Sequence, residues 1–570
     1  MILIFGGTTE GRMAADVCEE AGKPFFYSTK GALQSVALHN GVRLSGAMTE
    51  GDLQTFCQEN NIRCIIDAAH PFAENLHRTV ASATLPVIRV QRDFPPHIPE
   101  VTYCKDYDDA IMRMKQDGVK SLLALSGANT IARLKGFWTE VPTKFRILNR
   151  PESMALAREH GLRYDQLVFY DKNLPSLEEE KALICNSHCD AIITKESGES
   201  GGFDAKVQAA LALGVKVYVV ERPTLPRTWH YVTGRHSLRR EIERLVPDFF
   251  PLRTGLTTGA CATAAVKAAM LSLLYNECEE EVTFALPDGE TICIPVCNDA
   301  RGIATVTKEQ NDDPDVTKGC RITAKVEYGT DGIRFLQGEG VGRVTLPGLG
   351  IAVGEPAINP TPRMMICSEI RSLTDRDIDV TISVEGGRAL ASKTFNHKVG
   401  VVDGISIIGT SGIVKPLSNE AFVQSIRREM QVAMAIGCTE IGLVAGMKSE
   451  TALRRERDIR CIHYGNFIGE ALKAARDMGF ESVTLSIMIG KAVKLAEGHL
   501  DTHSHKVAMN KDFLCAVASK AGIDASPIAA ITMARELWDV MPPAFFDVIV
   551  SHCYKHCREI FPNVNIVLSR

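Results

Sequence analysis

Short apolar runs alternate with amphipathic segments along the first half of the chain. The runs have the length of buried strands and end in glycine or polar residues, whereas the segments between them space their apolar positions as helices do. Strands are predicted at residues 2–5, 25–27, 63–68, 85–90, 191–194 and 215–220, and helices at residues 12–21, 204–213 and 237–246. A second series of the same kind begins at residue 121. The pattern predicts an α/β fold built on parallel sheets.

The second half of the chain opens with a polar, glycine-containing loop and a long Ala-rich segment. Residues 261–274 contain neither Pro nor Gly and are predicted to form a helix. Residues 353–363 are too rich in Pro for a helix or a central strand. Strands are predicted at residues 281–286, 291–296, 404–412, 441–445 and 482–489, and a further helix at 466–478. This half is therefore expected to hold an α+β domain followed by a small doubly wound α/β unit.

Composition limits the class of protein without identifying it. A chain of 570 residues is too long for one core, and its 45% hydrophobic and 23% charged residues are ordinary for globular proteins. The net charge of −5 gives no indication of a nucleic-acid partner, and no membrane span or signal peptide is expected. The 17 cysteines form no short disulfide framework, which favours a reducing, cytoplasmic location.

A strand, a glycine-rich turn and a helix follow one another at the start of the chain. This is the layout of a dinucleotide loop, with Thr8 in place of the middle glycine. The candidate cofactor-binding residues are Gly6, Gly7, Thr8, Thr9, Gly11, Ser28, Thr29 and Lys30. The last three stand where an NAD site normally has an acidic residue, so they favour NADPH, with NADH left open.

Polar residues also follow other predicted strands, where open parallel sheets bind their ligands. Asp67 and His70 stand at the carboxyl end of the strand at 63–68 and are candidate substrate-site residues. Arg146 and Arg150 could bind carboxylates. In the second half, strand-end loops suited to a nucleoside ligand supply Gly446, Ser449, Glu450, Gly490 and Lys491.

Three stretches invite a metal interpretation, and in each another explanation is favoured. The acidic run at 311–317 lacks the spacing of an EF-hand and is expected to be a solvated turn. The histidines at 499, 503 and 505 do not share one helical face, and the His-Cys pairs at 552–553 and 556–557 fit buried helix cysteines. We expect no protein-bound metal.

Two sets of motifs resemble known families. Residues 6–11, 67–73, 194–198, 201–203 and 219–223 together resemble precorrin-6A reductase over residues 1–247, although the family usually has Thr where Ala69 stands. The second set consists of residues 253–261, 312–317, 340–342, 353–363, 404–412, 490–491 and 498–504. It resembles the cobalt-precorrin-5B (C1)-methyltransferase family over about residues 253–520 and departs from it at 446–450 and after 504.

These resemblances imply a bifunctional enzyme of cobalamin synthesis with domains at 1–247 and 253–570. The second domain would methylate C1 of cobalt-precorrin-5B with S-adenosylmethionine. The first, with two Rossmann-like lobes around its cleft, would reduce the product with a nicotinamide hydride. The cobalt would be carried by the tetrapyrrole substrate.

The resemblance also implies roles for individual residues. Asp67, His70 and Lys195 are the candidate catalytic residues, His70 and Lys195 as proton donors or positioning groups. Candidate contacts to the substrate and its carboxylates are Arg146, Arg150, Ser197, Gly198, Arg253, Thr254, Thr257, Thr258, Lys308, Arg343, Asn359, Arg363, Lys491, His503 and Ser504. Two rival interpretations remain: a non-catalytic corrinoid or cobalt carrier, and an unrelated NADP reductase fused to an α/β domain. The sequence leaves open the oligomeric state, the need for cobalt in the ring, and direct transfer between the two sites.

Overall fold

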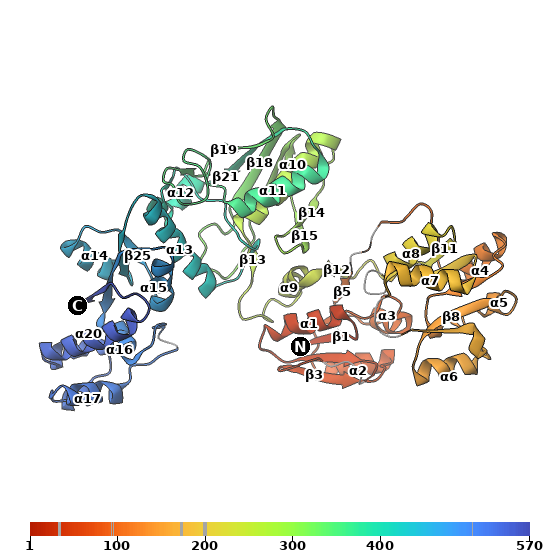
Figure 1. Ribbon diagram of the computed structural model, residues 1–570, viewed down its shortest axis with the longest axis horizontal. Helices are drawn as coiled ribbons and strands as arrows, with labels where there is room; N and C mark the ends of the chain where they lie inside the picture. The colour runs from red at the N-terminus through yellow and green to blue at the C-terminus, as the bar shows by residue number, and fades with distance from the viewer. Residues whose placement is uncertain (32–35, 93, 95, 171–174, 198–201, 504–505) are drawn as a thin grey trace. The chain divides into compact units, whose positions relative to one another are not determined.

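The computed structural model describes residues 1–570 apart from 32–35, 93, 95, 171–174, 198–201 and 504–505 (Figure 1). The chain divides into two compact units, Met1–Pro251 and Leu252–Arg570.

The first unit contains two six-stranded sheets in which every strand pairs in parallel with its neighbours. The first sheet has the order β12-β5-β4-β1-β2-β3. Its strands are β1 (Ile2–Phe5), β2 (Phe25–Thr29), β3 (Gly41–Ser45), β4 (Cys64–Asp67), β5 (Val87–Gln91) and β12 (His230–Thr233). All four residues of β1 and of β4 are buried. Helices therefore cover both faces of these central strands, as parallel sheets require.

The second sheet of this unit has the order β6-β11-β10-β7-β8-β9. Its strands are β6 (Thr102–Cys104), β7 (Leu122–Ala124), β8 (Thr143–Leu148), β9 (Leu167–Tyr170), β10 (Ala191–Lys195) and β11 (Lys216–Val220). In both sheets the strand order reverses at a central pair, β1 with β4 and β7 with β10. Ligands of doubly wound sheets bind beyond the strand ends at such a pair.

Nine α-helices and two 3₁₀ turns are described in the first unit. They are α1 (Thr9–Glu19), α2 (Glu50–Glu59), α3 (Glu74–Ala81), α4 (Tyr107–Gln116), α5 (Lys135–Trp138), α6 (Pro151–Glu159), α7 (Leu177–Ser187), α8 (Phe203–Ala212), α9 (Gly234–Leu245), η1 (Ala128–Thr130) and η2 (Tyr164–Gln166). Helix α1 begins earlier than the predicted residue 12, because the Thr8 side chain accepts a hydrogen bond from the Gly11 N–H and caps it.

The second unit contains a mixed sheet whose order is β16-β17-β18-β21-β19. Its strands are β16 (Cys297–Ala300), β17 (Ile303–Thr307), β18 (Arg321–Tyr328), β19 (Ile333–Gln337) and β21 (Ile378–Val384). Small two-stranded pairs flank it: β13 (Gly255–Leu256) with β23 (Ile413–Val414), β14 (Glu281–Ala285) with β15 (Thr291–Pro295), and β20 (Arg343–Val344) with β22 (Val401–Val402).

Helix α10 (Thr258–Tyr275) packs on β17 and β18 and against α11 (Pro360–Leu373). It is long and apolar enough to cross a membrane, yet 72% of it is buried inside the protein. The Ala-rich sequence therefore serves close packing in a core. The same unit contains α12 (Gly387–Ala391) and η4 (Asn396–Val399).

A parallel sheet of order β25-β24-β26-β27 completes the second unit. Its strands are β24 (Glu440–Val444), β25 (Cys461–His463), β26 (Ser482–Met488) and β27 (Val564–Ser569). The helices of this region are α13 (Asn419–Ala435), α14 (Met447–Glu456), α15 (Ile468–Asp477), α16 (Ile489–Glu497), α17 (Lys511–Lys520), α18 (Ser526–Ala530), α19 (Leu537–Val540) and α20 (Pro543–Arg558), with η5 (Ala534–Glu536).

Two local predictions were wrong. The Pro-rich segment 353–363 was expected to exclude a helix, but α11 begins at Pro360, because a helix tolerates Pro in its first turn. Residues 404–412 were expected to form a strand, but Ile405 and Ile407 make only isolated bridges.

Candidate functional sites

The glycine turn after β1 requires two glycines for close packing. A Cβ on Gly6 would lie 2.3 Å from the Tyr27 ring, and one on Gly11 would lie 2.7 Å from the Gly6 Cα atom. Gly7 has a φ of +100° and open space around it. Thr8 closes the turn by donating from Oγ1 to the carbonyl oxygen of Ala68, at 2.6 Å. The turn after β1 is thus fixed to the loop after β4, at the point where the strand order reverses.

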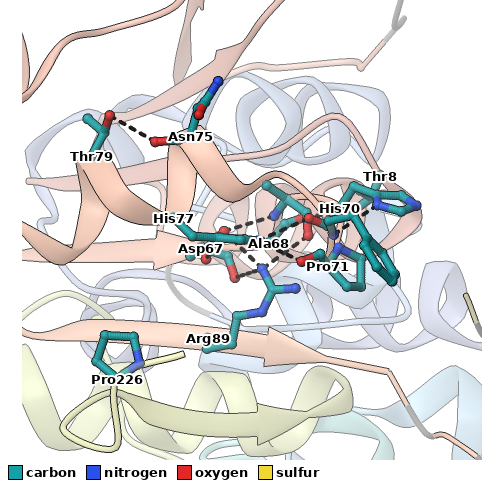
Figure 2. Close-up of polar contacts among 12 residues, drawn as sticks. Thr8, Asp67, Ala68, His70, Pro71, Asn75, His77, Thr79, Arg89 and Pro226 are labelled. Carbon is teal, nitrogen blue, oxygen red and sulfur yellow. Dashed lines mark hydrogen bonds and ion pairs between the residues drawn. The ribbon is translucent and has the colours of Figure 1, made fainter. Parts of the chain in front are cut away.

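A buried charged cluster supports the loop that follows β4 (Figure 2). Asp67 is fully buried, and its carboxylate lies 2.8 Å from Nδ1 of His77 and 2.9 Å from Nη1 of Arg89. It also accepts a hydrogen bond from the Ala69 N–H at 3.1 Å. Nε2 of His77 lies 3.1 Å from the His70 carbonyl oxygen. These contacts hold the loop that carries His70.

The His70 side chain lies at the surface end of this loop. Its Nδ1 accepts a hydrogen bond from the Phe72 N–H at 3.2 Å, so the proton of the neutral ring belongs on Nε2. Desolvation by the surrounding chain, followed by the charges of Lys195 and Arg92, lowers the pKa of His70 to about 4, although part of the residue stays exposed. His70 is thus a neutral hydrogen-bond donor at pH 7.

The second sheet contributes Lys195, at the end of β10. Its ammonium lies 5.2 Å from the centre of the Phe72 ring, two residues beyond His70. Burial and then the nearby Arg133 charge lower the pKa of Lys195. Ser197 is in the same loop, and its carbonyl oxygen accepts a hydrogen bond from Arg92 at 3.4 Å. Strand ends of both sheets therefore meet here; Gly198 lies outside the described residues.

The remaining candidates of the first unit differ in how available they are. Ser28 and Thr29 are 3% and 6% exposed, whereas Lys30 is exposed. Arg146 forms a buried ion pair with Glu180 at 2.7 Å, so its charge is already compensated within the protein. Arg150 precedes α6 and is half-buried.

In the second unit, the loop before α10 is tied to residues 404–412. Thr257 caps α10 by accepting a hydrogen bond from the Ala260 N–H, and the Gly259 N–H donates to the Ile408 carbonyl oxygen. The Thr258 hydroxyl accepts from the Ile408 N–H at 2.9 Å. The polar groups of Thr257, Thr258 and Gly259 at the start of the helix therefore form hydrogen bonds with other residues of the chain. Thr254 lies in the segment before them.

Four cationic candidates of this unit have acidic neighbours. Lys308 is 1% exposed and lies 2.7 Å from Asp315, while Arg363 lies 2.7 Å from Glu355. Two more ion pairs are longer and lie at the surface: Arg253 pairs with Asp312 at 3.4 Å, and Arg343 lies 3.8 Å from Asp403. Asn359 precedes α11 and is half-buried, as is His503, whose N–H donates to Asp501; Ser504 lies outside the described residues.

The ends of β24 and β26 are adjacent, because these strands pair in parallel with Val444 opposite Ser486. Gly446 and Gly490 follow them, and an added Cβ would meet nothing within 4 Å at Gly446 and only the Ala534 Cβ, at 4.0 Å, at Gly490. There is therefore room beside both glycines. Ser449, in contrast, is buried and accepts the Gly446 N–H at 3.1 Å.

Two charged groups border this strand edge. Glu450 lies 2.6 Å from Nε2 of His463, at the end of β25, and 3.5 Å from Nζ of Lys398. Lys491 donates to Oδ1 of Asn466 at 2.8 Å and lies 5.4 Å from the centre of the Tyr464 ring. Burial and then the neighbouring Lys494 lower the pKa of Lys491 to about 8.

Helix α13 contributes a buried acidic residue, Glu429, whose charge interacts with those of Lys398 and Glu450. Glu429 is 7% exposed, and desolvation raises its pKa to about 7 against the opposing charges of Lys398 and Arg460. Sequence reasoning missed this residue, because an acidic residue within an amphipathic helix gives no sign of its burial. It also missed His77, Arg89, Arg92, Lys398 and His463; for Arg92, its place just after the predicted strand at 85–90 was the available signal.

The His-Cys pairs of α20 are not arranged as a thiolate site. Sγ of Cys553 donates to the Ala492 carbonyl oxygen at 3.3 Å. Burial raises the pKa of Cys557 to about 12. Both thiols are therefore protonated core groups at neutral pH.

The glycine turn at one reversal of strand order, the cluster of ionisable groups beside it and the open strand edge of the second unit define a two-part α/β enzyme. Residues 1–243 match the family of Precorrin-6x reductase CbiJ/CobK, and residues 247–416 match the CbiD family.

Residues of the second unit are similar to methyltransferases from several bacteria. The cobalt-precorrin-5B C(1)-methyltransferase of Prosthecochloris aestuarii is 43% identical over 338 residues, which cover 55% of this chain and 91% of the relative. That of Pseudomonas putida is 39% identical over 55% of this chain and 91% of its own, and that of a Geobacillus species 39% over 53% and 88%. The chain belongs to the cobalt-precorrin-5B C(1)-methyltransferase family, and its first unit is a fused precorrin-6x reductase. It therefore combines a methyltransferase and a reductase of cobalamin biosynthesis.

Proposed function

We propose that residues 1–247 reduce the corrin precursor and that residues 253–570 methylate it. The observation that carries this assignment is a coincidence of boundaries. The compact units divide at residues 251 and 252, and the two family matches meet between residues 243 and 247. In this scheme cobalt-precorrin-5B is methylated at C1 to cobalt-precorrin-6A, which the first unit then reduces to cobalt-precorrin-6B in the cytoplasm.

The reductase and methyltransferase families imply a nicotinamide cofactor and S-adenosylmethionine. The turn after β1 fits a dinucleotide, because side chains at Gly6 and Gly11 would fill the space that brings strand and helix together. We propose NADPH as the reductant, with exposed Lys30 at the end of β2 facing its extra phosphate. The cofactor supplies the hydride.

The proton for the neighbouring ring carbon comes, in this proposal, from the Lys195 ammonium. Its lowered pKa makes that group a better acid at neutral pH than an ordinary lysine. Neutral His70 donates from Nε2 to the ring or to one of its acid arms, and Asp67 acts as a positioning residue through Ala69 and His77. Ser197 and Gly198 are further proposed substrate contacts.

Methyl transfer requires mainly alignment, since a ring carbon attacks the methyl group that S-adenosylmethionine supplies. We propose that the nucleoside lies over Gly446 and Gly490, in the open space beyond β24 and β26. Glu450 and Lys491 border this place. The proposed anchors for the carboxylates of the tetrapyrrole are Arg253, Thr254, Thr257, Thr258, Lys308, Arg343, Asn359, Arg363, His503 and Ser504. Cobalt stays in the ring of the substrate throughout.

Separated fragments test the assignment. Fragments 1–247 and 253–570 are expected each to unfold cooperatively and to retain one activity, reduction for the first and methylation for the second. Loss of both activities in two folded fragments would contradict the division.

A further inference from the structure

The first unit contains a cavity of about 450 Å³ beside the proposed reduction site. The end of β5, from the first sheet, and the segment that follows β11, from the second, both line it. Pro71 and Glu196 belong to the lining and directly adjoin His70 and Lys195 in the sequence. The cavity therefore opens next to the groups proposed to handle the proton.

Four arginines and two glutamates line this cavity. Arg89 is only 3% exposed, and all its hydrogen bonds and its ion pair in the described structure are made by Nη1. Its Nε and Nη2 groups therefore have no partner among the described residues, although the side chain lines the cavity. A buried guanidinium with free N–H groups favours an anionic ligand.

Two more guanidinium groups have unused donors. Arg222 bonds Glu196 through Nε at 2.9 Å and stacks on Phe94, 3.6 Å from the ring centre. This stacking fixes the plane of the guanidinium and leaves its Nη groups without a partner in the part of the chain that the structure describes. Arg227 has no ion-pair or hydrogen-bond partner for its side chain within the same described residues.

We propose that this cavity, defined by Arg89, Arg222 and Arg227, binds carboxylate arms of the tetrapyrrole during reduction. The proposal rests on the reductase function assigned to this unit. Planar arginine forks match carboxylates in two-point contacts, and the cavity is of a size that takes side arms. Phosphate groups of the nicotinamide cofactor are the other anions available. The glycine turn that suits them includes Glu10, which pairs with Arg92 of the cavity lining at 2.7 Å, so binding of the cofactor has to be measured beside binding of the tetrapyrrole.

The test measures two ligands on the full chain. Arg222→Gln and Arg227→Gln are combined, and Arg158→Gln on exposed α6 is the control. Binding of cobalt-precorrin-6A is followed by its absorbance without cofactor, and binding of NADPH by its fluorescence. The double variant should bind the tetrapyrrole about 10- to 100-fold more weakly, since a hydrogen bond to a charged group contributes about 1.5–3 kcal/mol. Its affinity for NADPH, and both affinities of the control, should stay at the parent values.

Each alternative outcome is decisive. Weaker binding of NADPH with unchanged binding of the tetrapyrrole would assign the cavity to the cofactor and overturn the proposal. Unchanged binding of both ligands would overturn it as well. Because tetrapyrrole binding is measured without turnover, a parent protein that binds cobalt-precorrin-6A but fails to reduce it would contradict the proposed function and leave the cavity assignment supported.

Discussion

Glu429→Gln should stabilise the second unit in a way that depends on pH. Burial raises the pKa of Glu429 from its ordinary 4.5 to about 7. Between these two values the folded protein keeps the carboxyl proton, whereas the unfolded chain releases it. The contribution of Glu429 to stability is therefore fully present below pH 4.5 and is lost as the pH rises through about 7.

The size of the effect follows from the same shift. One pKa unit corresponds to about 1.4 kcal/mol, so ionisation of Glu429 lowers the free energy of unfolding by up to about 3 kcal/mol. Glutamine does not titrate and keeps the amide polarity. We therefore expect the variant to match the parent near pH 4 and to exceed it by about 2–3 kcal/mol at pH 8.5.

Hydrogen exchange of peptides from β24 provides the assay, because it reports the opening of the second unit separately from the first. Glu420→Gln on the same helix is the control: Glu420 is exposed, so its replacement should change protection equally at both pH values. A Glu429→Gln variant with the same protection as the parent at pH 8.5 would refute the reasoning, since it would mean that Glu429 is solvated when ionised.

Three further changes test the first unit. Asp67→Asn should cost about 3–5 kcal/mol of stability by leaving buried Arg89 without its carboxylate, measured by calorimetry of the full chain; a loss below 1 kcal/mol would contradict the buried ion pair. Gly11→Ala should weaken NADPH binding and lower the melting temperature, whereas Gly51→Ala, which has open space around its Cβ, should be neutral or stabilising; equal melting temperatures for the two variants would rule out the packing role. Lys30→Asp should reduce the preference for NADPH over NADH by about 1 kcal/mol in titrations, and an unchanged preference would remove Lys30 from the cofactor site.

The sequence predicted the parallel sheets of the first unit because their central strands are apolar on both faces. The strand ends at Gly6 and Asp67 could be located for the same reason, and the structure brings them together through Thr8. Strand β12 was not predicted, since it follows a Pro-containing segment and pairs with β5 from a distant part of the chain. Such a pairing leaves no local pattern.

The partners of charged residues were the least predictable part of the sites. Arg146 was expected to meet a substrate carboxylate, but it forms a buried pair with Glu180, which lies 34 residues away in the sequence. In the same way, the sequence does not reveal which N–H groups of Arg89 and Arg222 lack a hydrogen-bond partner among the described residues, because the partners come from distant parts of the chain. Helix α11 shows a related limit, because its prolines suggested a break where they in fact start a helix.

The most direct test of the two-part account is a coupled assay on the purified chain, read by mass and absorbance. Cobalt-precorrin-5B with S-adenosylmethionine alone should gain one methyl group and stop. Addition of NADPH should then add two hydrogens to that methylated product, and Lys195→Met should abolish only this second step. A protein that binds cobalt tightly without tetrapyrrole and leaves the mass of cobalt-precorrin-5B unchanged would contradict the account and favour a carrier.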